Sequence, residues 1–478
     1  MATPSSWIKR GFLWLSGLLL ALVALVIGAL LYFGIPRHAA GMAAKGVCSA
    51  AFVAGRPWQQ LLADDVLPAS PVLGLISMTV DENARAVTAR FAGLFTRRAV
   101  LLPHRGCVLE GSPAGAPAIA PTRPNPQASA LWPQGEAAMP VAAWGPGVDA
   151  AALQLAVEQA FVGAGDPQAA NARGVAIIHQ GRLLALRTAP GFSPGTPLHG
   201  WSMTKTVGAM LMHKLAADTQ LSLESPVVAA FAPAREPAWV AAWRADARQR
   251  ITVSDLLYMR DGLASTEDYD PWGSVPRMLW GQPSVAAFAA AAPMQAAPGE
   301  RWRYLSASAN LLASVARGRF ASDPDYWAYP AKALFAPIGA TSAVLETDTE
   351  GNWVASSYLW ASVGDWGRLG QLMLNDGRWG ETQVLPKGWL QRAATPSTPQ
   401  GDGQGYGAHT WLIGNPVAGE CKNHGLPPDT LAMLGHWGQI VAVVPSREAV
   451  IVRLGWTFKR HQFDNCAFVA DVLRALPH

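Results

Sequence analysis

The sequence predicts an α/β (α+β) fold in which a central antiparallel sheet lies between layers of helices and adjoins an all-helical lobe. Two pairs of apolar segments, 175–178 with 183–186 and 440–444 with 449–454, are each joined by a short turn and are typical of β-hairpins. These segments are apolar almost without interruption, as expected of strands that are covered on both faces. Helical periodicity dominates residues 203–380, so we expect an all-helical lobe there and a functional site at its seam with the sheet.

The first helix of this lobe is predicted to begin at Ser202. Its apolar residues recur at helical spacing: Val207, Met210, Leu211 and Leu215. Ser202 and Lys205 form an S-x-x-K motif on one helix face, so Lys205 Nζ can reach Ser202 Oγ. A serine hydroxyl becomes a good nucleophile when a neighbour takes its proton, and a lysine does this when its pKa is lowered. The structural alternative is that Ser202 caps the helix and Lys205 is solvated.

Two further motifs each precede a predicted helix or strand. The sequence Y-L-S at 304–306 leads into a helical run at 309–316, and H-W-G at 436–438 leads into the strand at 440–444. Taken singly, Tyr304 fits an aromatic residue stacked at a helix entry, and His436 fits a core histidine beside a strand. The order and spacing of the three motifs together favour a catalytic site.

With this order and spacing, residues from about 150 to 478 resemble the serine hydrolases of the class C β-lactamase and penicillin-binding-protein superfamily. The resemblance implies a β-lactamase/transpeptidase-like fold that uses no metal and no cofactor. It also implies that Ser202 is the nucleophile and that Lys205, aided by Tyr304, takes its proton. The backbone N–H groups of Ser202 and Gln439 would hold the oxyanion. The remaining residues expected to bind substrate or tune proton transfer are Ser306, His436, Trp437 and Gly438.

Two departures from the family pattern bear on the substrate. Ser306 stands where β-lactamases of this type carry Asn, and His436 and Trp437 replace the Lys and Thr of K-T-G, which would pair with a β-lactam carboxylate. These motif forms are nearer to esterases and to relatives of 6-aminohexanoate-dimer hydrolase. We therefore expect a small-molecule amide or ester substrate. The alternatives are a true β-lactamase or D,D-peptidase, and a non-hydrolysing envelope protein that binds peptidoglycan or peptide ligands.

Other chemistries fit the sequence less well. The G-x-S-x-G elbow of α/β-hydrolases is broken at Thr204, and the ten histidines form none of the usual zinc motifs. The acidic group of Glu267, Asp268 and Asp270 is interpreted as a solvated or capping turn. A net charge of +4 that is spread along the chain does not indicate a nucleic-acid partner.

The N-terminus predicts a membrane anchor. No charged residue occurs from 11 to 36, and such a run can span a bilayer core of about 30 Å at about 1.5 Å per residue. Lys9 and Arg10 precede the run, so we expect residues 1–10 to form a cytoplasmic tail and the catalytic part to lie outside, in a periplasm or extracellular space. The alternative is a signal peptide cleaved near residues 39–44.

The four cysteines fall into two regional pairs. Cys48 and Cys107 flank the segment before a proline-rich stretch, whereas Cys421 and Cys466 lie near the C-terminus. We expect disulfides Cys48–Cys107 and Cys421–Cys466, which form in oxidising compartments. Four buried free thiols are the alternative.

The chain is therefore expected to contain three parts after the anchor. Residues 37–110 would form a small disulfide-clamped module with short strands at 73–80, 84–91 and 99–102. Eight prolines between Glu110 and Pro146 predict that residues 111–149 are a linker or a chain that wraps the surface. Residues 150–478 would form the hydrolase domain, with a C-terminal helix at 466–476 packed on the sheet.

Overall fold

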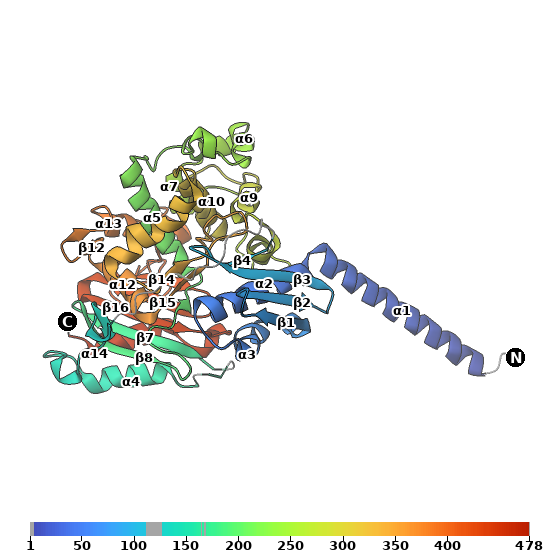
Figure 1. Ribbon diagram of the computed structural model, residues 1–478, viewed down its shortest axis with the longest axis horizontal. Coiled ribbons are helices and arrows are strands. Elements are labelled where there is room, and N and C mark those ends of the chain that lie inside the picture. The colour runs from blue at the N-terminus through green and yellow to red at the C-terminus, as the bar shows by residue number, and fades with distance from the viewer. Residues whose placement is uncertain (1–3, 111–126, 164, 167–168, 478) are drawn as a thin grey trace.

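The central antiparallel sheet is present in the computed structural model, which describes residues 4–110, 127–163, 165–166 and 169–477 (Figure 1). Its strand order is β14-β15-β16-β7-β8, and each neighbouring pair is antiparallel. The five strands are β14 (Leu431–Gly435), β15 (Gln439–Val444), β16 (Ala449–Gly455), β7 (Ala172–His179) and β8 (Arg182–Thr188). The two predicted hairpins are thus joined edge to edge through β16 and β7.

Helices cover both faces of this sheet, which explains the long apolar runs in its strands. Successive residues of a strand point to opposite faces, so Ile177 enters one hydrophobic core and Ile178 enters the other. The first core contains α4 (Ala150–Ala160) and α14 (Asn465–Ala475), which pack together. Against the other face lies α12 (Val363–Leu374).

The predicted helical lobe is present, but the expectation of an all-helical segment from 203 to 380 is too simple. The segment also holds two strands of a small sheet, β10 (Val344–Leu345) and β11 (Leu359–Ala361), and β11 pairs with β9 (Leu198–His199). These strands are too short to show an alternating pattern in the sequence. The strand β9 is important because it leads directly to Ser202.

The helices of the lobe surround the start of two buried helices, α5 (Met203–Thr219) and α10 (Ser306–Arg317). The short helices of the lobe are α6 (Trp239–Arg244), α7 (Val253–Leu257), α8 (Ser274–Pro276), α9 (Val285–Ala290), α11 (Asp323–Pro330) and α13 (Trp389–Ala394). Helix α3 (Trp58–Leu61) belongs to the N-terminal module. A two-stranded hairpin, β12 (Arg378–Trp379) with β13 (Thr382–Gln383), lies beside α13.

The N-terminal apolar segment forms α1 (Pro4–Tyr32), which projects from the body of the protein (Figure 1). Residues Phe12–Tyr32 are long and apolar enough to cross a membrane, and none of the most apolar window is buried. Gly34 then adopts a left-handed conformation with φ 69°, and α2 (Ile35–Cys48) begins at the next residue. This second helix, which is almost wholly buried, was not predicted from the sequence.

The module that follows contains a four-stranded antiparallel sheet packed on α2. Its strands are β1 (Ile76–Asp81), β2 (Ala86–Phe91), β3 (Phe95–Leu102) and β4 (Gly106–Leu109). The predicted first strand begins later than expected, because residues from Pro71 to Leu75 form a 3₁₀ turn. The fourth strand is too short to be recognised from its sequence. The disulfide Cys48–Cys107 joins the end of α2 to β4, as expected.

Buried polar contacts fasten this module to the catalytic part. Lys45 Nζ on α2 lies 3.2 Å from Glu346 Oε2, and both side chains are almost fully buried. Glu346 Oε1 also accepts a hydrogen bond from the Cys107 N–H at 2.8 Å. In a second contact, Asp65 pairs with Arg173 of β7. The module and the hydrolase domain therefore share one hydrophobic core.

The segment between the module and the hydrolase domain follows the surface of the domain where it is described. Residues 127–137 form β5 (Gln127–Leu131) and β6 (Gly135–Ala137), and the predicted linker residues 111–126 lie outside the described part of the chain. Arg368 of α12 donates hydrogen bonds to Glu136 Oε1 at 2.7 Å and to the Gly135 carbonyl at 2.8 Å. This second half of the segment is thus held against the sheet-covering helix.

Candidate active site

Ser202 stands at the first turn of α5 with its hydroxyl free for chemistry. It occupies the N-cap position, but its side chain makes no capping hydrogen bond, so the simple helix-cap interpretation is wrong. Lys205 Nζ instead donates a hydrogen bond to Ser202 Oγ at 2.8 Å. Trp201, just before the serine, has a φ of 48°, a conformation that a large side chain rarely adopts. The chain thus turns sharply to present Ser202.

Lys205 is buried rather than solvated. Its side chain is 1% exposed, and Nζ also donates to Ser306 Oγ and to the Ser356 carbonyl, each at 3.0 Å. Burial lowers the pKa of Lys205 to about 8, against the opposing effect of the Glu267 carboxylate. When it loses a proton, the amine keeps two N–H groups for Ser306 and Ser356 and turns its lone pair toward Ser202. This geometry suits a base.

Ser306 connects Lys205 to the carboxylate of Glu267, which was predicted from the sequence to belong to a solvated or capping turn. The Ser306 hydroxyl donates to Glu267 Oε1 and its N–H donates to Glu267 Oε2, both at 2.6 Å. Glu267 Oε1 lies 3.9 Å from Lys205 Nζ. Of the acidic group, Asp268 does stabilise its own turn by accepting from the Asp270 N–H at 2.9 Å. The prediction of a purely solvated or capping turn is therefore wrong for Glu267, whose inward orientation depends on how the whole loop folds.

The position of Ser306 explains why a hydroxyl fits where related β-lactamases carry an amide. A hydroxyl donates one hydrogen bond and accepts others at the same oxygen atom. Ser306 Oγ uses both abilities, since it accepts from Lys205 and donates to Glu267. The three groups form a continuous hydrogen-bonded path from the amine to the carboxylate.

Two tyrosine hydroxyls reach Ser202. The hydroxyls of Tyr304, which was predicted, and of Tyr269, which was missed, lie beside the Ser202 side chain in the same cleft. The Tyr269 hydroxyl donates a hydrogen bond to Glu267 Oε1 at 3.4 Å. Burial, with a further contribution from Glu267, raises the pKa of both tyrosines above the ordinary value. Both hydroxyls therefore stay protonated and act as hydrogen-bond donors. A sign of Tyr269 in the sequence was its position two residues after Glu267, in the same loop.

The predicted strand motif forms the tight turn between β14 and β15. His436 stacks on Tyr269 with ring centroids 4.5 Å apart and planes 6° apart. Burial, and then the charge of Lys205, lower the pKa of His436 to about 4, so the imidazole is neutral near neutral pH. Trp437 packs edge-on against Trp201 at 5.0 Å. The turn therefore presents a neutral, largely aromatic wall to the site.

Gln439 holds this turn in place through its side chain. Its Nε2 donates to the carbonyl of His436 at 3.0 Å, and its Oε1 accepts from the Gly455 N–H at 2.9 Å. Opposite Gln439 in the ladder is Gly435, where an added Cβ would lie 2.3 Å from the Gly200 carbonyl oxygen. The sheet edge thus touches the turn that carries Ser202. Within the described residues, the Ser202 N–H has no backbone acceptor.

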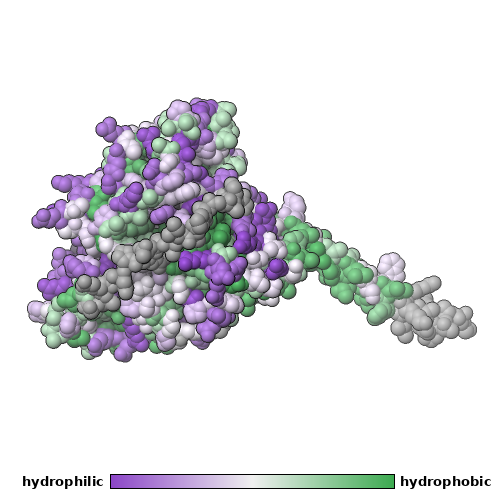
Figure 2. Space-filling model, viewed as in Figure 1, coloured by the Kyte–Doolittle hydropathy of each residue, from purple (hydrophilic) through white to green (hydrophobic). Residues whose placement is uncertain are grey.

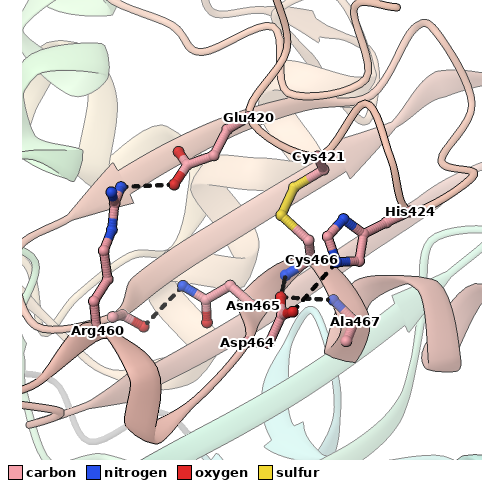
Figure 3. The surroundings of a disulfide bond; sticks show 9 residues. Glu420, Cys421, His424, Arg460, Asp464, Asn465, Cys466 and Ala467 are labelled. Carbon is pink, nitrogen blue, oxygen red and sulfur yellow. Dashed lines mark hydrogen bonds and ion pairs between the residues drawn. A yellow bond between two sulfur atoms is a disulfide. The ribbon is translucent and has the colours of Figure 1, made fainter.

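These groups open into a cleft of about 950 Å³ that runs from Ser202 to the second disulfide. Its inner end contains Glu267, Tyr269, Tyr304, Trp411, His436 and Trp437. At the outer end, the disulfide Cys421–Cys466 ties the chain before β14 to α14, as expected. Figure 3 shows this end, where Glu420 pairs with Arg460 at 2.8 Å and His424 with Asp464 at 3.2 Å.

Another cavity, of about 670 Å³, lies behind Leu305 and is lined by Asp261, Arg301 and Trp302, but Ser202 does not line it. The cleft at Ser202 is therefore the candidate active site. Across the described ranges, no three His, Cys, Asp or Glu residues are arranged to hold a metal ion.

Comparison with known families identifies the family of the chain. The Beta-lactamase family model matches residues 150–472. A comparison with curated protein sequences gives no match.

Solved structures share the fold at low sequence identity. A Bacillus anthracis protein assigned as a 6-aminohexanoate-dimer hydrolase is 18% identical, with a TM-score of 0.50, over 67% of this chain and 83% of that chain. The structure of SurE with D-Leu is 18% identical, with a TM-score of 0.51, over 69% and 76% of the two chains. EstCE1, described as a hydrolase with promiscuous acyltransferase activity, is 14% identical, with a TM-score of 0.50, over 68% and 97%. At these identities the likeness concerns the fold alone.

Proposed function

Because the chain belongs to the β-lactamase family of serine hydrolases, we propose that it cleaves small amides or esters through an acyl-enzyme on Ser202. The observation that carries this proposal is the 2.8 Å contact between Lys205 Nζ and Ser202 Oγ at the inner end of the cleft. The pKa of about 8 for Lys205 supports it, because an appreciable fraction of the amine is neutral at mildly alkaline pH.

In the first step, neutral Lys205 takes the proton of Ser202 as Oγ bonds to the substrate carbonyl carbon. The carbonyl oxygen becomes an oxyanion, and the backbone N–H groups of Ser202 and Gln439 are the proposed donors that hold it. As the intermediate collapses, the bond to the leaving group breaks. Lys205 returns its proton to the leaving group, with the protonated hydroxyl of Tyr304 as the relay.

In the second step, water attacks the acyl group and Ser202 leaves. Resemblance to the family favours Tyr304 as the group that activates this water, but its raised pKa disfavours the tyrosinate that such a base requires. We therefore assign the water proton to Lys205, which is neutral again after the first step and which passes that proton to Ser202 Oγ as the acyl bond breaks and the acid product leaves. Glu267 and Ser306 hold the amine in place throughout.

The wall formed by His436 and Trp437 supports a substrate without an essential carboxylate. It carries no cation, because the imidazole is neutral. Rates with p-nitrophenyl esters, simple amides, nitrocefin and a D-alanyl-D-alanine peptide distinguish the candidates. The proposal expects esters or amides to be turned over and nitrocefin to react slowly. Fast nitrocefin hydrolysis without ester turnover would instead identify a β-lactamase.

Covalent labelling tests the acyl-enzyme. A fluorophosphonate probe should label the protein at Ser202, and Ser202→Ala should abolish both labelling and turnover, whereas the exposed control Ser193→Ala should change neither. Absence of labelling together with measurable binding of muropeptides would contradict the hydrolase mechanism and favour a binding protein of the envelope.

We also propose that α1 anchors the enzyme in a membrane with the catalytic part in a periplasm or extracellular space. The exposed apolar face of α1 and the two disulfides support this arrangement. Cleavage near residues 39–44 would cut the buried helix α2, which favours an uncleaved anchor. Retention in membranes after alkaline carbonate washing, with an intact N-terminal peptide in mass spectra, is the expected result. Release by the wash would contradict it.

A further inference from the structure

One end of the N-terminal module lies beside the point where α1 leaves the body. At the other end, the disulfide Cys48–Cys107 joins the end of α2 to β4, and Cys107 pairs with Leu101 near the end of β3. Helix α2 and strand β3 both extend for about 20 Å and pack together. The start of β3 at Phe95 therefore lies near the start of α2 and the end of α1 (Figure 1).

This end of the sheet exposes a group of apolar side chains. The turn between β2 and β3 spans residues 92–94, and with Phe95 and Leu75 it is here called the hairpin tip. Leu94 is 79% exposed, Leu75 is 56% exposed and Phe95 is 37% exposed. The Ala92 N–H donates to the Leu75 carbonyl at 2.9 Å, so these residues lie together. Apolar side chains that are exposed as a group mark an interaction surface, whereas single exposed apolar residues are common on soluble proteins.

Two arginines without carboxylate partners lie at the same end. Burial lowers the pKa of Arg97 on β3, and the charge of the nearby Arg37 on α2 lowers it further. Neither forms an ion pair with the described residues, whereas the neighbouring Arg98 pairs with Glu110. Two like charges held together favour an anion between them.

We propose that the hairpin tip rests in the headgroup layer of the membrane that holds α1, with Leu94 and Phe95 toward the acyl chains and Arg37 and Arg97 on lipid phosphates. The inference rests on the proposed anchoring by α1. Only Phe33 and Gly34 separate α1 from the buried helix α2, so the body cannot move far from the bilayer surface. Hydrophilic side chains border the point where the apolar helix leaves the body in Figure 2, as this arrangement requires.

Depth-dependent quenching in full-length protein tests the contact. Single cysteines are introduced as Leu94→Cys at the tip, Leu20→Cys in α1 and Val162→Cys at the end of α4, and each is labelled with the fluorophore NBD under non-reducing conditions. Figure 1 places α4 on the far side of the body from α1, and Val162 is 69% exposed. In vesicles of phosphatidylcholine and phosphatidylglycerol, spin-labelled lipid should quench the labels at 94 and 20 but not at 162.

The outcomes separate this inference from the anchoring itself. If spin-labelled lipid quenches the label at residue 20 but not the label at residue 94, the tip contact is overturned and the anchor stays intact. If the label at residue 20 is not quenched, both the anchor and the tip contact are overturned. A label at 94 that is shielded from aqueous iodide but not quenched by lipid would indicate that protein covers the tip, which also overturns the inference.

The arginines have their own test. Removing two charges that contact an anionic surface should weaken the tip contact roughly 30-fold. Arg37→Gln combined with Arg97→Gln should therefore reduce lipid quenching at 94 and leave quenching at 20 unchanged. The matched control, Arg182→Gln with Arg378→Gln, removes two charges from exposed positions elsewhere and should change neither. Equal quenching of the label at residue 94 in the Leu94→Cys protein, in its Arg37→Gln, Arg97→Gln variant and in the control variant would exclude the phosphate contact.

Discussion

Removing the charge of Glu267 should move the pH dependence of catalysis toward acid. Glu267 stabilises the protonated form of Lys205, whose pKa is about 8, and catalysis needs the neutral form. The rate constant kcat/KM should therefore rise with pH up to about 8 and level off above it. In Glu267→Gln the ammonium form loses a favourable neighbour, so the pKa of Lys205 falls and the rising limb of the profile moves to lower pH.

The distance between the two charges gives the size of this shift. At 3.9 Å, a pair of unit charges interacts by about 1 kcal/mol in water and about 4 kcal/mol at the effective dielectric of a partly buried site. Since about 1.4 kcal/mol corresponds to one pKa unit, the limb should move down by about 1 to 3 units. Relative to its own plateau, the variant should be about tenfold or more faster than the native enzyme near pH 6.

The assay is ester hydrolysis followed from mildly acidic to alkaline pH, with each profile scaled to its own plateau. Scaling is needed because the variant also loses a charged acceptor for Ser306, which lowers its maximal rate. The control is Asp270→Asn, which removes an exposed carboxylate from the same loop and should leave the limb in place. If the rising part of the kcat/KM profile stays at the same pH in Glu267→Gln, or moves to higher pH, the assignment of Lys205 as the base is refuted.

Three further changes test other parts of the structure. Lys205→Arg keeps the positive charge but cannot lose its proton, so hydrolysis and acylation of Ser202 should fall by about 10² or more in a burst assay, and near-native turnover would exclude a lysine base. His436→Lys with Trp437→Thr restores a cation and a hydroxyl on the turn, which should raise nitrocefin acylation relative to ester turnover by roughly tenfold to a hundredfold, and an unchanged ratio would refute the role of this wall. Glu346→Gln leaves a buried cation on α2 without its partner, so the free energy of unfolding should fall by about 3 kcal/mol in urea titrations, and an unchanged midpoint would show that this ion pair is not stabilising.

Much of the fold could be predicted because it depends on long, repeated patterns. The strands β7 and β15 are buried along their whole length since helices cover both faces, and their apolar runs 174–178 and 440–444 are visible without the structure. Strands of two to four residues, such as β4 and β9, show no period and could not be found. The buried helix α2 was missed for another reason, because its small alanine-rich sequence continues from the apolar anchor without a clear boundary.

Some residues of the candidate site could likewise be predicted from the sequence, and others could not. Ser202, Lys205 and Tyr304 belong to motifs with fixed spacing, so their approach follows from local helix geometry and family resemblance. Glu267 and Tyr269 come from a loop, and their inward orientation is determined by contacts with α10, 39 residues from Glu267, and with the distant β14–β15 turn. The sequence shows the chemical type of such a residue, but it does not show whether its side chain points into the site or into solvent.

The contact between α2 and Glu346 has a consequence for the order of folding. Ser49 and Glu346, which share a hydrogen bond at 2.9 Å, are 297 residues apart. At a synthesis rate of about 5 to 20 residues per second, α2 emerges some tens of seconds before the residue that neutralises its buried lysine. The strand β7 is likewise made long before β16, its partner in the central sheet. With α1 as the proposed anchor, the N-terminus would be in the membrane while the attached domain is still unfolded, so that folding of this hydrolase would take place beside the bilayer and finish only when the last strands have been made.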